Sequence, residues 1–363
     1  MTKYKLLTPG PLTTTDTVKQ AMLVDHCTWD DDYKKITVKI CNDLLDLAHC
    51  SHDVYSCVLM QGSGTFGVES VLSSAIGDDD KLLVITNGAY GNRIVEIARI
   101  LNLNYDVMQV PYNEQPSPNE INDYLRTHPN NTHVAIVHCE TTTGILNDLE
   151  AIAKVVKAHN QVLFVDAMSS FGGIEIEVER LNIDFIIASA NKCIQGVPGF
   201  SFIIAKTDEL MKTKGCERSL SLSLYGQWEE MKKDGKWRFT SPTHVVLAFA
   251  KALEELKAEG GISARNKRYQ ANMDKVRAEF SALGLKSYLT TDVQSPIITT
   301  FAYPDKNFSF IEMYDFIKAR GFAIYPGKLL DLDTFRIGVI GEIYLEDIKK
   351  LVQVMGEYLE GKK

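Results

Sequence analysis

The chain has 363 residues, of which 45% are hydrophobic and 24% charged, a balance typical of globular proteins large enough to bury a core. The formal net charge is -8 and the basic residues are scattered, so we expect no nucleic-acid partner. No apolar run approaches the roughly 18 residues that span a bilayer, and the N-terminus lacks the apolar core of a signal peptide. Seven cysteines without a C-x-x-C pair suit free thiols in a reducing compartment. We therefore expect a cytoplasmic protein with no membrane partner.

Strand-like and helical patterns alternate between residues 81 and 205. The apolar runs, in chain order, are KLLVIT, YDVMQV, HVAIVH, VLFVDA, DFIIAS and FSFIIA. These runs are continuous, which predicts strands buried on both faces of a mostly parallel sheet. Helical patterns such as IVEIARILN and LEAIAKVVKAH separate several of them. This order of elements predicts an open α/β sheet.

The pattern changes after residue 241. We expect two long helices at 244–261 and 263–283, the first of which ends at a Gly-Gly pair that suits a helix C-terminus. Further elements are a strand at 296–303, a helix at 310–320, the strand-like pieces FAIYPG and TFRIGV, and a last helix that begins near residue 344. Together they predict a smaller α+β domain. We place the large domain at residues 21–241, and the small domain at residues 1–20 together with 242–363.

Two charged residues follow neighbouring strands of the predicted sheet. Asp166 ends VLFVD, and Lys192 follows FIIASAN one strand–helix–strand step later. Ligands of open α/β sheets collect at the carboxyl ends of the strands. Pyridoxal phosphate requires a lysine to bind its aldehyde and a carboxylate to keep its ring nitrogen protonated. Alone, Asp166 could be a helix N-cap and Lys192 a solvated side chain, but the pair favours chemistry.

Three further segments after strand ends carry small or hydroxyl residues. QGSGTFGVES leads into a helix, so Ser63, Gly64 and Thr65 could present N–H groups and hydroxyls to a phosphate, with a dinucleotide loop or a simple helix cap as alternatives. In TNGAYGNR, Tyr90 could lie flat on an aromatic ring or merely occupy an Asn-Gly turn. The hydroxyls of HCETTTG could reach a cofactor oxygen or cap the next helix.

Arg336 lies inside TFRIGV, an apolar strand-like run. A guanidinium group there needs an anionic partner, because burial of an unpaired charge is costly. The partner could be a substrate carboxylate or phosphonate, or it could be an internal salt bridge.

A cluster of possible metal ligands lies near residue 50, where the sequence reads HCSHD. It comprises His49, Cys50, His52 and Asp53. Their spacing fits no closed zinc pattern, so we interpret them as a polar helix end and expect no metal.

Taken together, these motifs resemble the class V aminotransferases of PLP fold type I, and the resemblance covers nearly the whole chain. It is carried by LLTPGPLTTT, LMQGSGTFGVES, NGAYGNR, ETTTG, KWRFTSPTH and FRIG, and most specifically by VDAMSSFGG with SANKCIQGVPGF. It implies a large domain with a mostly parallel seven-stranded sheet, a smaller α+β domain, and pyridoxal 5'-phosphate as the cofactor. The resemblance is closest to family members that transfer the amino group of 2-aminoethylphosphonate to pyruvate in phosphonate degradation. It therefore implies 2-aminoethylphosphonate and pyruvate as the substrates.

The resemblance also assigns roles to single residues. Lys192 would carry the cofactor as a Schiff base, Asp166 would pair with its ring nitrogen, and Arg336 would bind the anionic end of the substrate. The cofactor phosphate would be bound by Ser63, Gly64, Thr65 and Asn191. Tyr90 would stack on the face of the cofactor ring. Thr143 or, failing that, Thr141 would lie beside the ring oxygen. Thr240 would reach the phosphate of a partner subunit's cofactor, which implies an obligate homodimer.

Three alternatives remain at this point. One is another class V transaminase of the alanine–glyoxylate or serine–pyruvate type. Another is a lyase such as a cysteine desulfurase, which needs a nucleophilic cysteine on a late loop, whereas the last cysteine of this chain is Cys216. The third is a catalytically silent PLP-binding or nucleotide-binding protein, which the presence of Lys192, Asp166 and Arg336 disfavours.

Overall fold

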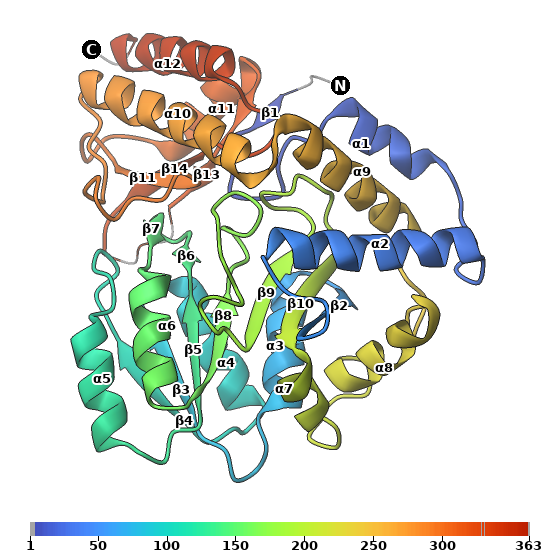
Figure 1. The fold of residues 1–363 in the computed structure, drawn as a ribbon. Helices are drawn as coiled ribbons and strands as arrows, with labels where there is room; N and C mark the ends of the chain where they lie inside the picture. Colours follow the sequence, from blue (N-terminus) through green and yellow to red (C-terminus); the bar gives the residue numbers. More distant parts are fainter. Residues whose placement is uncertain (1–3, 328, 330, 362–363) are drawn as a thin grey trace.

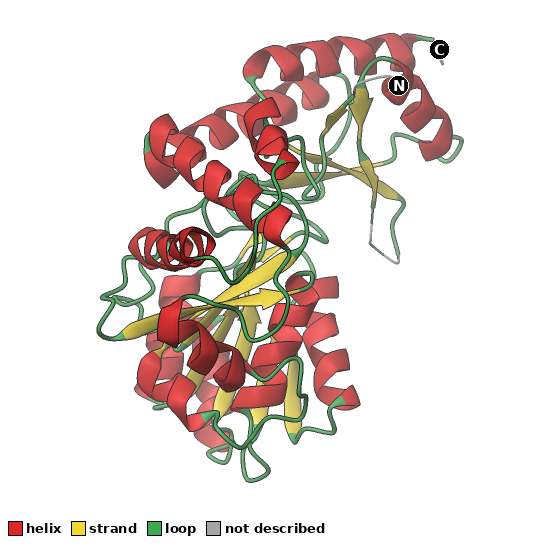
Figure 2. Cartoon of the chain, turned by 90° about the vertical axis from the view of Figure 1, so that its right-hand side faces the viewer, coloured by secondary structure: helices red, strands yellow, loops and turns green. Residues whose placement is uncertain are grey.

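Two sheets of unequal size organise the chain, as the two views in Figures 1 and 2 show. The structure is a computed structural model that describes residues 4–327, 329 and 331–361. The large sheet lies in the lower half of both views, and the smaller sheet lies near the top, where both ends of the described chain are found.

The large sheet has seven strands in the order β2-β10-β9-β8-β5-β3-β4. In that order the strands are Tyr55–Gln61, Phe200–Lys206, Phe185–Ser189, Val162–Asp166, His133–Val137, Leu82–Thr86 and Tyr105–Gln109. Strand β10 runs antiparallel to both of its neighbours, and the other pairs are parallel. The predicted seven-stranded, mostly parallel sheet is therefore confirmed, and each of the six apolar runs forms one of its strands.

Helices cover both faces of this sheet, which explains why the inner strands β3, β5 and β9 are buried along their whole length, whereas the edge strand β4 is only partly buried. On β5, Val134 and Ile136 join the core on one face, whereas Ala135 and Val137 join the core on the other. The first face is covered by α2 (Asp31–Leu47), α5 (Pro118–Thr127), α6 (Leu149–Ala158) and α9 (Thr243–Glu259). The second is covered by α3 (Gly64–Ala75), α4 (Ala89–Ile100), α7 (Thr207–Lys212) and α8 (Leu224–Asp234). Within the described ranges, none of the helices is long and apolar enough to cross a membrane.

The smaller sheet is antiparallel, in the order β11-β14-β13, and three helices pack on it around a separate core. Its strands are Ile298–Ala302, Thr334–Gly338 and Tyr325–Pro326, and the helices are α10 (Gly261–Ala282), α11 (Phe310–Ala319) and α12 (Leu345–Glu360). In a separate two-stranded sheet, the N-terminal β1 (Lys5–Leu6) pairs in parallel with β12 (Phe322–Ala323). The short hairpin of β6 (Cys139–Glu140) and β7 (Ile145–Leu146) extends from the large sheet towards the small sheet (Figure 1).

The predicted domain boundary stays a prediction. Val18 of α1 (Asp16–Gln20) and the buried face of α9 belong to the core of the large sheet, and the 3-10 helix η1 (Ala21–Leu23) links α1 to the rest of the chain. The two small-domain segments, 1–20 and 242–363, also include residues 1–3, 328, 330, 362 and 363, which lie outside the described part of the chain.

The predicted glycine pair lies at the junction of α9 and α10, where Gly260 separates the two helices and Gly261 is the first residue of α10. Gly260 ends α9 with a φ of 107°, a left-handed conformation that glycine adopts without strain. Because α10 begins at the next residue, the last turn of α9 lies beside the first turns of α10. This short turn brings Glu259 next to two arginines of α10.

Candidate active site

A cavity of about 250 Å³ opens at the carboxyl edge of the large sheet. Seven of the ten residues singled out from the sequence line it, namely Ser63, Gly64, Thr65, Tyr90, Asp166, Asn191 and Lys192. They come from the segments that follow β2, β3, β8 and β9 and from the starts of α3 and α4. The sheet therefore brings together side chains that are far apart in the sequence.

Lys192 lies against the N-terminal segment of the chain. Its Nζ donates a hydrogen bond to the carbonyl of Pro9 at 2.9 Å. Gly10 has a φ of 119°, and a Cβ on it would come within 2.7 Å of Lys192 Cδ and 2.8 Å of Nζ. Sequence reasoning missed this contact, although LLTPGPLTTT is among the motifs that carry the resemblance.

Asp166, the last residue of β8, is 7% exposed and accepts a hydrogen bond from the N–H of Met168 at 2.9 Å. Burial is the main reason why the pKa of this carboxyl rises to about 6. The nearby Glu140 also raises it, and Lys192 and Arg93 act in the opposite direction. A cation beside the carboxyl would therefore stabilise its ionised form.

The start of α3 is suited to an anion. Ser63 is the N-cap residue of α3, but its hydroxyl accepts no hydrogen bond from the N–H groups of the helix. Helix α3 presents its N-terminal N–H groups and the positive end of its dipole at the same place. Arg93 of α4 adds a charge, since its Nη1 donates to the hydroxyl of Thr65 at 3.3 Å. Sequence reasoning missed Arg93, which lies one helical turn after Tyr90 and so faces the same side.

A buried carboxylate holds the start of α4, which carries Tyr90. Glu140 is fully buried and accepts the N–H groups of Tyr90 at 3.0 Å and Gly91 at 3.1 Å. Its other oxygen accepts the hydroxyl of Thr142 at 2.6 Å. Burial raises the pKa of Glu140, and these hydrogen bonds oppose the rise. Glu140 therefore fixes the position of Tyr90, a role that the sequence HCETTTG does not indicate.

Arg336 on β14 is 2% exposed. It donates to two backbone carbonyls, from Nε to Pro326 at 3.0 Å and from Nη1 to Thr141 at 2.8 Å. Burial lowers the pKa of Arg336, and the neighbouring Tyr90 hydroxyl opposes this. Among the described residues, no carboxylate forms an ion pair with it, so the internal salt bridge considered from the sequence is not found there.

The remaining predicted residues lie away from the cavity lining. Thr143 is fully buried, and its hydroxyl accepts the N–H of Ile145 at 3.4 Å. Thr240 is exposed in the loop before α9. Their assigned roles stay predictions, as do those of the other site residues.

Near residue 50, two histidines have carboxylate partners of their own. His52 contacts Asp46 at 2.9 Å, and His49 contacts Glu175. Over the part of the chain that the structure describes, no group of three His, Cys, Asp or Glu side chains is arranged to hold a metal ion.

The residues around the cavity fit pyridoxal phosphate by their chemistry. Lys192 supplies an amine for the aldehyde, and the buried Asp166 supplies an acid that a ring N–H would satisfy. The start of α3 with Arg93 supplies donors for the phosphate, and Tyr90 supplies an aromatic wall.

Comparison with known proteins agrees with this chemistry. The family model described as Aminotransferase class-V matches residues 51–329. A 2-aminoethylphosphonate–pyruvate transaminase from Lysinibacillus sphaericus is 60% identical over 359 residues, which is 99% of this chain and 98% of that protein. One of the same name from Bacteroides fragilis is 53% identical and covers 98% of this chain and 99% of its own length. Among solved structures, the pyridoxamine-pyruvate aminotransferase from Mesorhizobium loti is similar, with a TM-score of 0.91, 25% identity, and coverage of 99% of this chain and 93% of that one.

We predict that Gly10→Ala lowers the affinity for pyridoxal phosphate by about tenfold or more, because the added methyl group would overlap Lys192. Gly284→Ala is the control, since Gly284 also has a positive φ of 87°, but a Cβ added there would meet no described atom within 4 Å. Titration of each cofactor-free variant with pyridoxal phosphate, followed by visible absorption, measures the affinity. Equal affinities for the two variants would contradict the prediction.

The raised pKa of Asp166 predicts a pH dependence of stability in the cofactor-free protein. The carboxyl titrates near pH 3.8 when unfolded and near pH 6 when folded, so its contribution is complete below 3.8 and is lost as the pH rises through 6. We expect the difference in unfolding free energy between the wild type and Asp166→Asn to fall by about 3 kcal/mol across this window. Urea unfolding at several pH values checks this, and a constant difference would contradict it.

Proposed function

Because this chain belongs to the class-V aminotransferase family, we propose that it transfers the amino group of 2-aminoethylphosphonate to pyruvate. The products are phosphonoacetaldehyde and L-alanine, so the two substrates exchange an amine for a carbonyl oxygen. The observation that carries the proposal is Arg336, a buried guanidinium group with backbone carbonyls rather than a carboxylate as its described partners. The 60% identity to a transaminase of this name supports the choice of donor.

Pyridoxal phosphate is the cofactor of this enzyme. When bound, it supplies the carbonyl carbon that receives the amino group and a ring that draws electrons from the carbon that loses a proton. In our proposal Lys192 holds the cofactor covalently, Asp166 holds its ring nitrogen, and Ser63 and Thr65 hold its phosphate. The Lys192 amine, when not bonded to the cofactor, would be placed to act as a general base that takes the proton from the donor carbon next to nitrogen, and then as a general acid that returns a proton.

Arg336 serves both halves of the proposed reaction because both substrates are anions. A phosphonate and a carboxylate each present oxygens that a guanidinium fork can bind. The carbonyls of Thr141 and Pro326 hold the guanidinium in a fixed orientation without neutralising its charge. A substrate anion therefore meets a preoriented positive charge in a site of low polarity, where such a contact is strongest.

We also propose that the enzyme is a homodimer and works in the cytoplasm. Thr240 is exposed and follows Phe239, whose side chain is 49% exposed, as expected of residues that a partner subunit would cover. In the dimer Thr240 would reach the cofactor phosphate of the other subunit. The seven cysteines, all within the described residues, are unpaired, which supports a reducing compartment.

A spectrum of the purified enzyme tests the donor. We expect 2-aminoethylphosphonate, added without pyruvate, to abolish the visible band of the lysine-bound cofactor and to produce the absorption of its amine form. Pyruvate should then restore the original band, because the two half-reactions run in opposite directions through the same groups. A visible band that is unchanged by 2-aminoethylphosphonate but is lost on addition of L-alanine or L-serine would indicate another class V transaminase.

We expect Arg336→Ala to raise KM for both 2-aminoethylphosphonate and pyruvate by about a hundredfold, because each loses its charged partner. Arg320→Ala is the matched control, since Arg320 is 41% exposed and pairs with Glu357 on the surface. Steady-state kinetics with each substrate varied in turn gives the two constants. An effect confined to pyruvate would show that the phosphonate binds elsewhere.

A further inference from the structure

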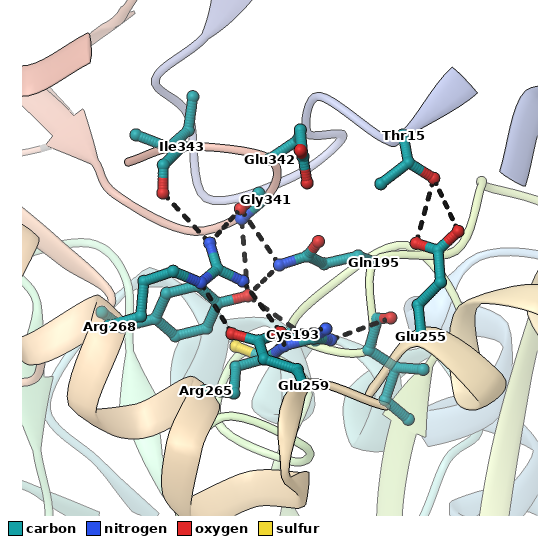
Figure 3. A network of polar contacts seen from close by, with 12 residues as sticks. Thr15, Cys193, Gln195, Glu255, Glu259, Arg265, Arg268, Gly341, Glu342 and Ile343 are labelled. Atoms are coloured by element: carbon teal, nitrogen blue, oxygen red, sulfur yellow. Dashed lines mark hydrogen bonds and ion pairs between the residues drawn. The ribbon is translucent and has the colours of Figure 1, made fainter. Parts of the chain in front are cut away.

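One carboxylate and two guanidinium groups form a cluster beside Cys193 and Ile194, the two residues that follow Lys192 (Figure 3). Glu259, the last residue of α9, accepts from Arg265 at 2.6 Å and 2.9 Å, and from Arg268 at 2.7 Å and 3.2 Å. The side chains of Arg265 and Arg268 are 2% and 13% exposed. We call Glu259, Arg265 and Arg268 the clamp.

Arg265 binds the loop that carries Lys192. Its Nη1 donates to the carbonyl of Cys193 at 2.9 Å and to that of Ile194 at 3.2 Å. These carbonyls belong to the two residues after Lys192, in a segment after β9 that forms turns rather than a helix or strand and is buried at residues 193–196. The loop therefore depends on Arg265 for donors that a strand or helix would otherwise supply.

Arg268 binds a different loop, the one that follows the strand of Arg336. Its Nη1 donates to the carbonyl of Gly341 at 2.7 Å and to that of Ile343 at 3.0 Å. The same loop touches the N-terminal segment, since the N–H of Glu342 donates to the carbonyl of Thr13 at 2.8 Å. Figure 3 shows the two arginines reaching towards these two loops from one helix.

Gln195 joins the two loops directly. Its Nε2 donates to the carbonyl of Gly341 at 3.0 Å and to the hydroxyl of Tyr269 at 2.7 Å. Tyr269 in turn donates to the carbonyl of Cys193 at 3.3 Å. The loop after Lys192 and the loop after β14 are thus held by one connected set of hydrogen bonds.

Glu259 is the member on which the clamp depends. Two buried guanidinium groups on adjacent turns of α10 repel each other, and burial of their charge without an anion is costly. Burial would raise the pKa of Glu259, but the two arginines outweigh that effect and lower it, so the carboxylate stays ionised. Its two oxygens hold the two guanidinium groups side by side.

We propose that Glu259 is a positioning residue for amino transfer, because through Arg265 and Arg268 it holds the Lys192 loop in register with the strand that carries Arg336. This inference rests on the proposed function, in which Lys192 moves the proton and Arg336 holds the substrate anion. Loss of Glu259 would let the two loops shift relative to each other. A displacement of about 1 Å between reacting groups can cost about a hundredfold in rate.

The test compares Glu259→Gln with Glu255→Gln in the full-length holoenzyme. Glu255 lies one turn earlier on α9, and its carboxylate accepts hydrogen bonds from Thr15 at 2.9 Å and 3.0 Å and from Thr17 (Figure 3). Among the described residues, the Glu255 carboxylate has no hydrogen bond or ion pair with the side chains of the clamp. The two substitutions make the same chemical change on the same helix. A purely structural role for Glu259 would therefore predict equal effects at equal loss of thermal stability.

Two readouts are measured on each variant. The first is the single-turnover rate at which 2-aminoethylphosphonate removes the visible band, which we expect to fall about tenfold or more in Glu259→Gln and less than about twofold in Glu255→Gln. The second is the pH midpoint of the visible band without substrate, which reports the surroundings of the cofactor-bound Lys192 nitrogen. We expect it to shift by about half a pH unit in Glu259→Gln only.

Equal changes in the two variants, in both readouts, would overturn the proposal. If Glu259→Gln does not fold, Arg268→Lys replaces it, because lysine keeps the charge beside Glu259 but cannot also bind the carbonyls of Gly341 and Ile343. Wild-type values in that variant would likewise overturn the proposal. If 2-aminoethylphosphonate leaves the visible band of the wild-type enzyme unchanged, the proposed function is refuted. The pH midpoint is measured without substrate, so it would still decide the role of Glu259.

Discussion

The loop that carries Lys192 is buried without regular secondary structure, and its backbone carbonyls must find donors inside the protein. Arg265 donates to the carbonyls of Cys193 and Ile194, and Tyr269 also donates to that of Cys193, so a full positive charge is buried beside the site. That charge requires Glu259, and Glu259 reaches Arg265 only because Gly260 allows α10 to begin directly after α9. The need of the loop carbonyls for donors is thus linked to the junction of α9 and α10 and to the cluster of Glu259 with its two arginines.

The site combines buried charges whose balance is completed by ligands. Arg336 and the start of α3 with Arg93 present positive potential, and the proposed substrate and the cofactor phosphate are anions. The pKa of the buried Asp166 is raised, and a protonated ring nitrogen beside it, as we propose, would lower that pKa. Groups oriented before the ligands arrive need no reorganisation during the reaction, which is the main source of electrostatic catalysis.

The fold was largely predictable because its signals are local. Continuous apolar runs such as HVAIVH predict strands covered on both faces, and both faces of β5 are indeed covered. The Gly-Gly pair predicted where α9 ends. Arg93 could have been found by the same local reasoning, since it lies one turn after Tyr90 within a quoted motif. Glu140 could not, because a carboxylate among hydroxyl residues gives no sign that it will bind the N–H groups of another segment.

By itself, the sequence determined the strands and helices, the residue types at the strand ends and, through its motifs, the resemblance to a family and the pair Lys192 and Asp166. These depend on patterns within short stretches of chain. Only the tertiary structure decided that Pro9 and Gly10 lie against Lys192, that Arg336 binds carbonyls rather than a carboxylate, and that Glu259 links two loops. Contacts of this kind join residues far apart along the chain, and their partners are set by packing, which no local pattern encodes.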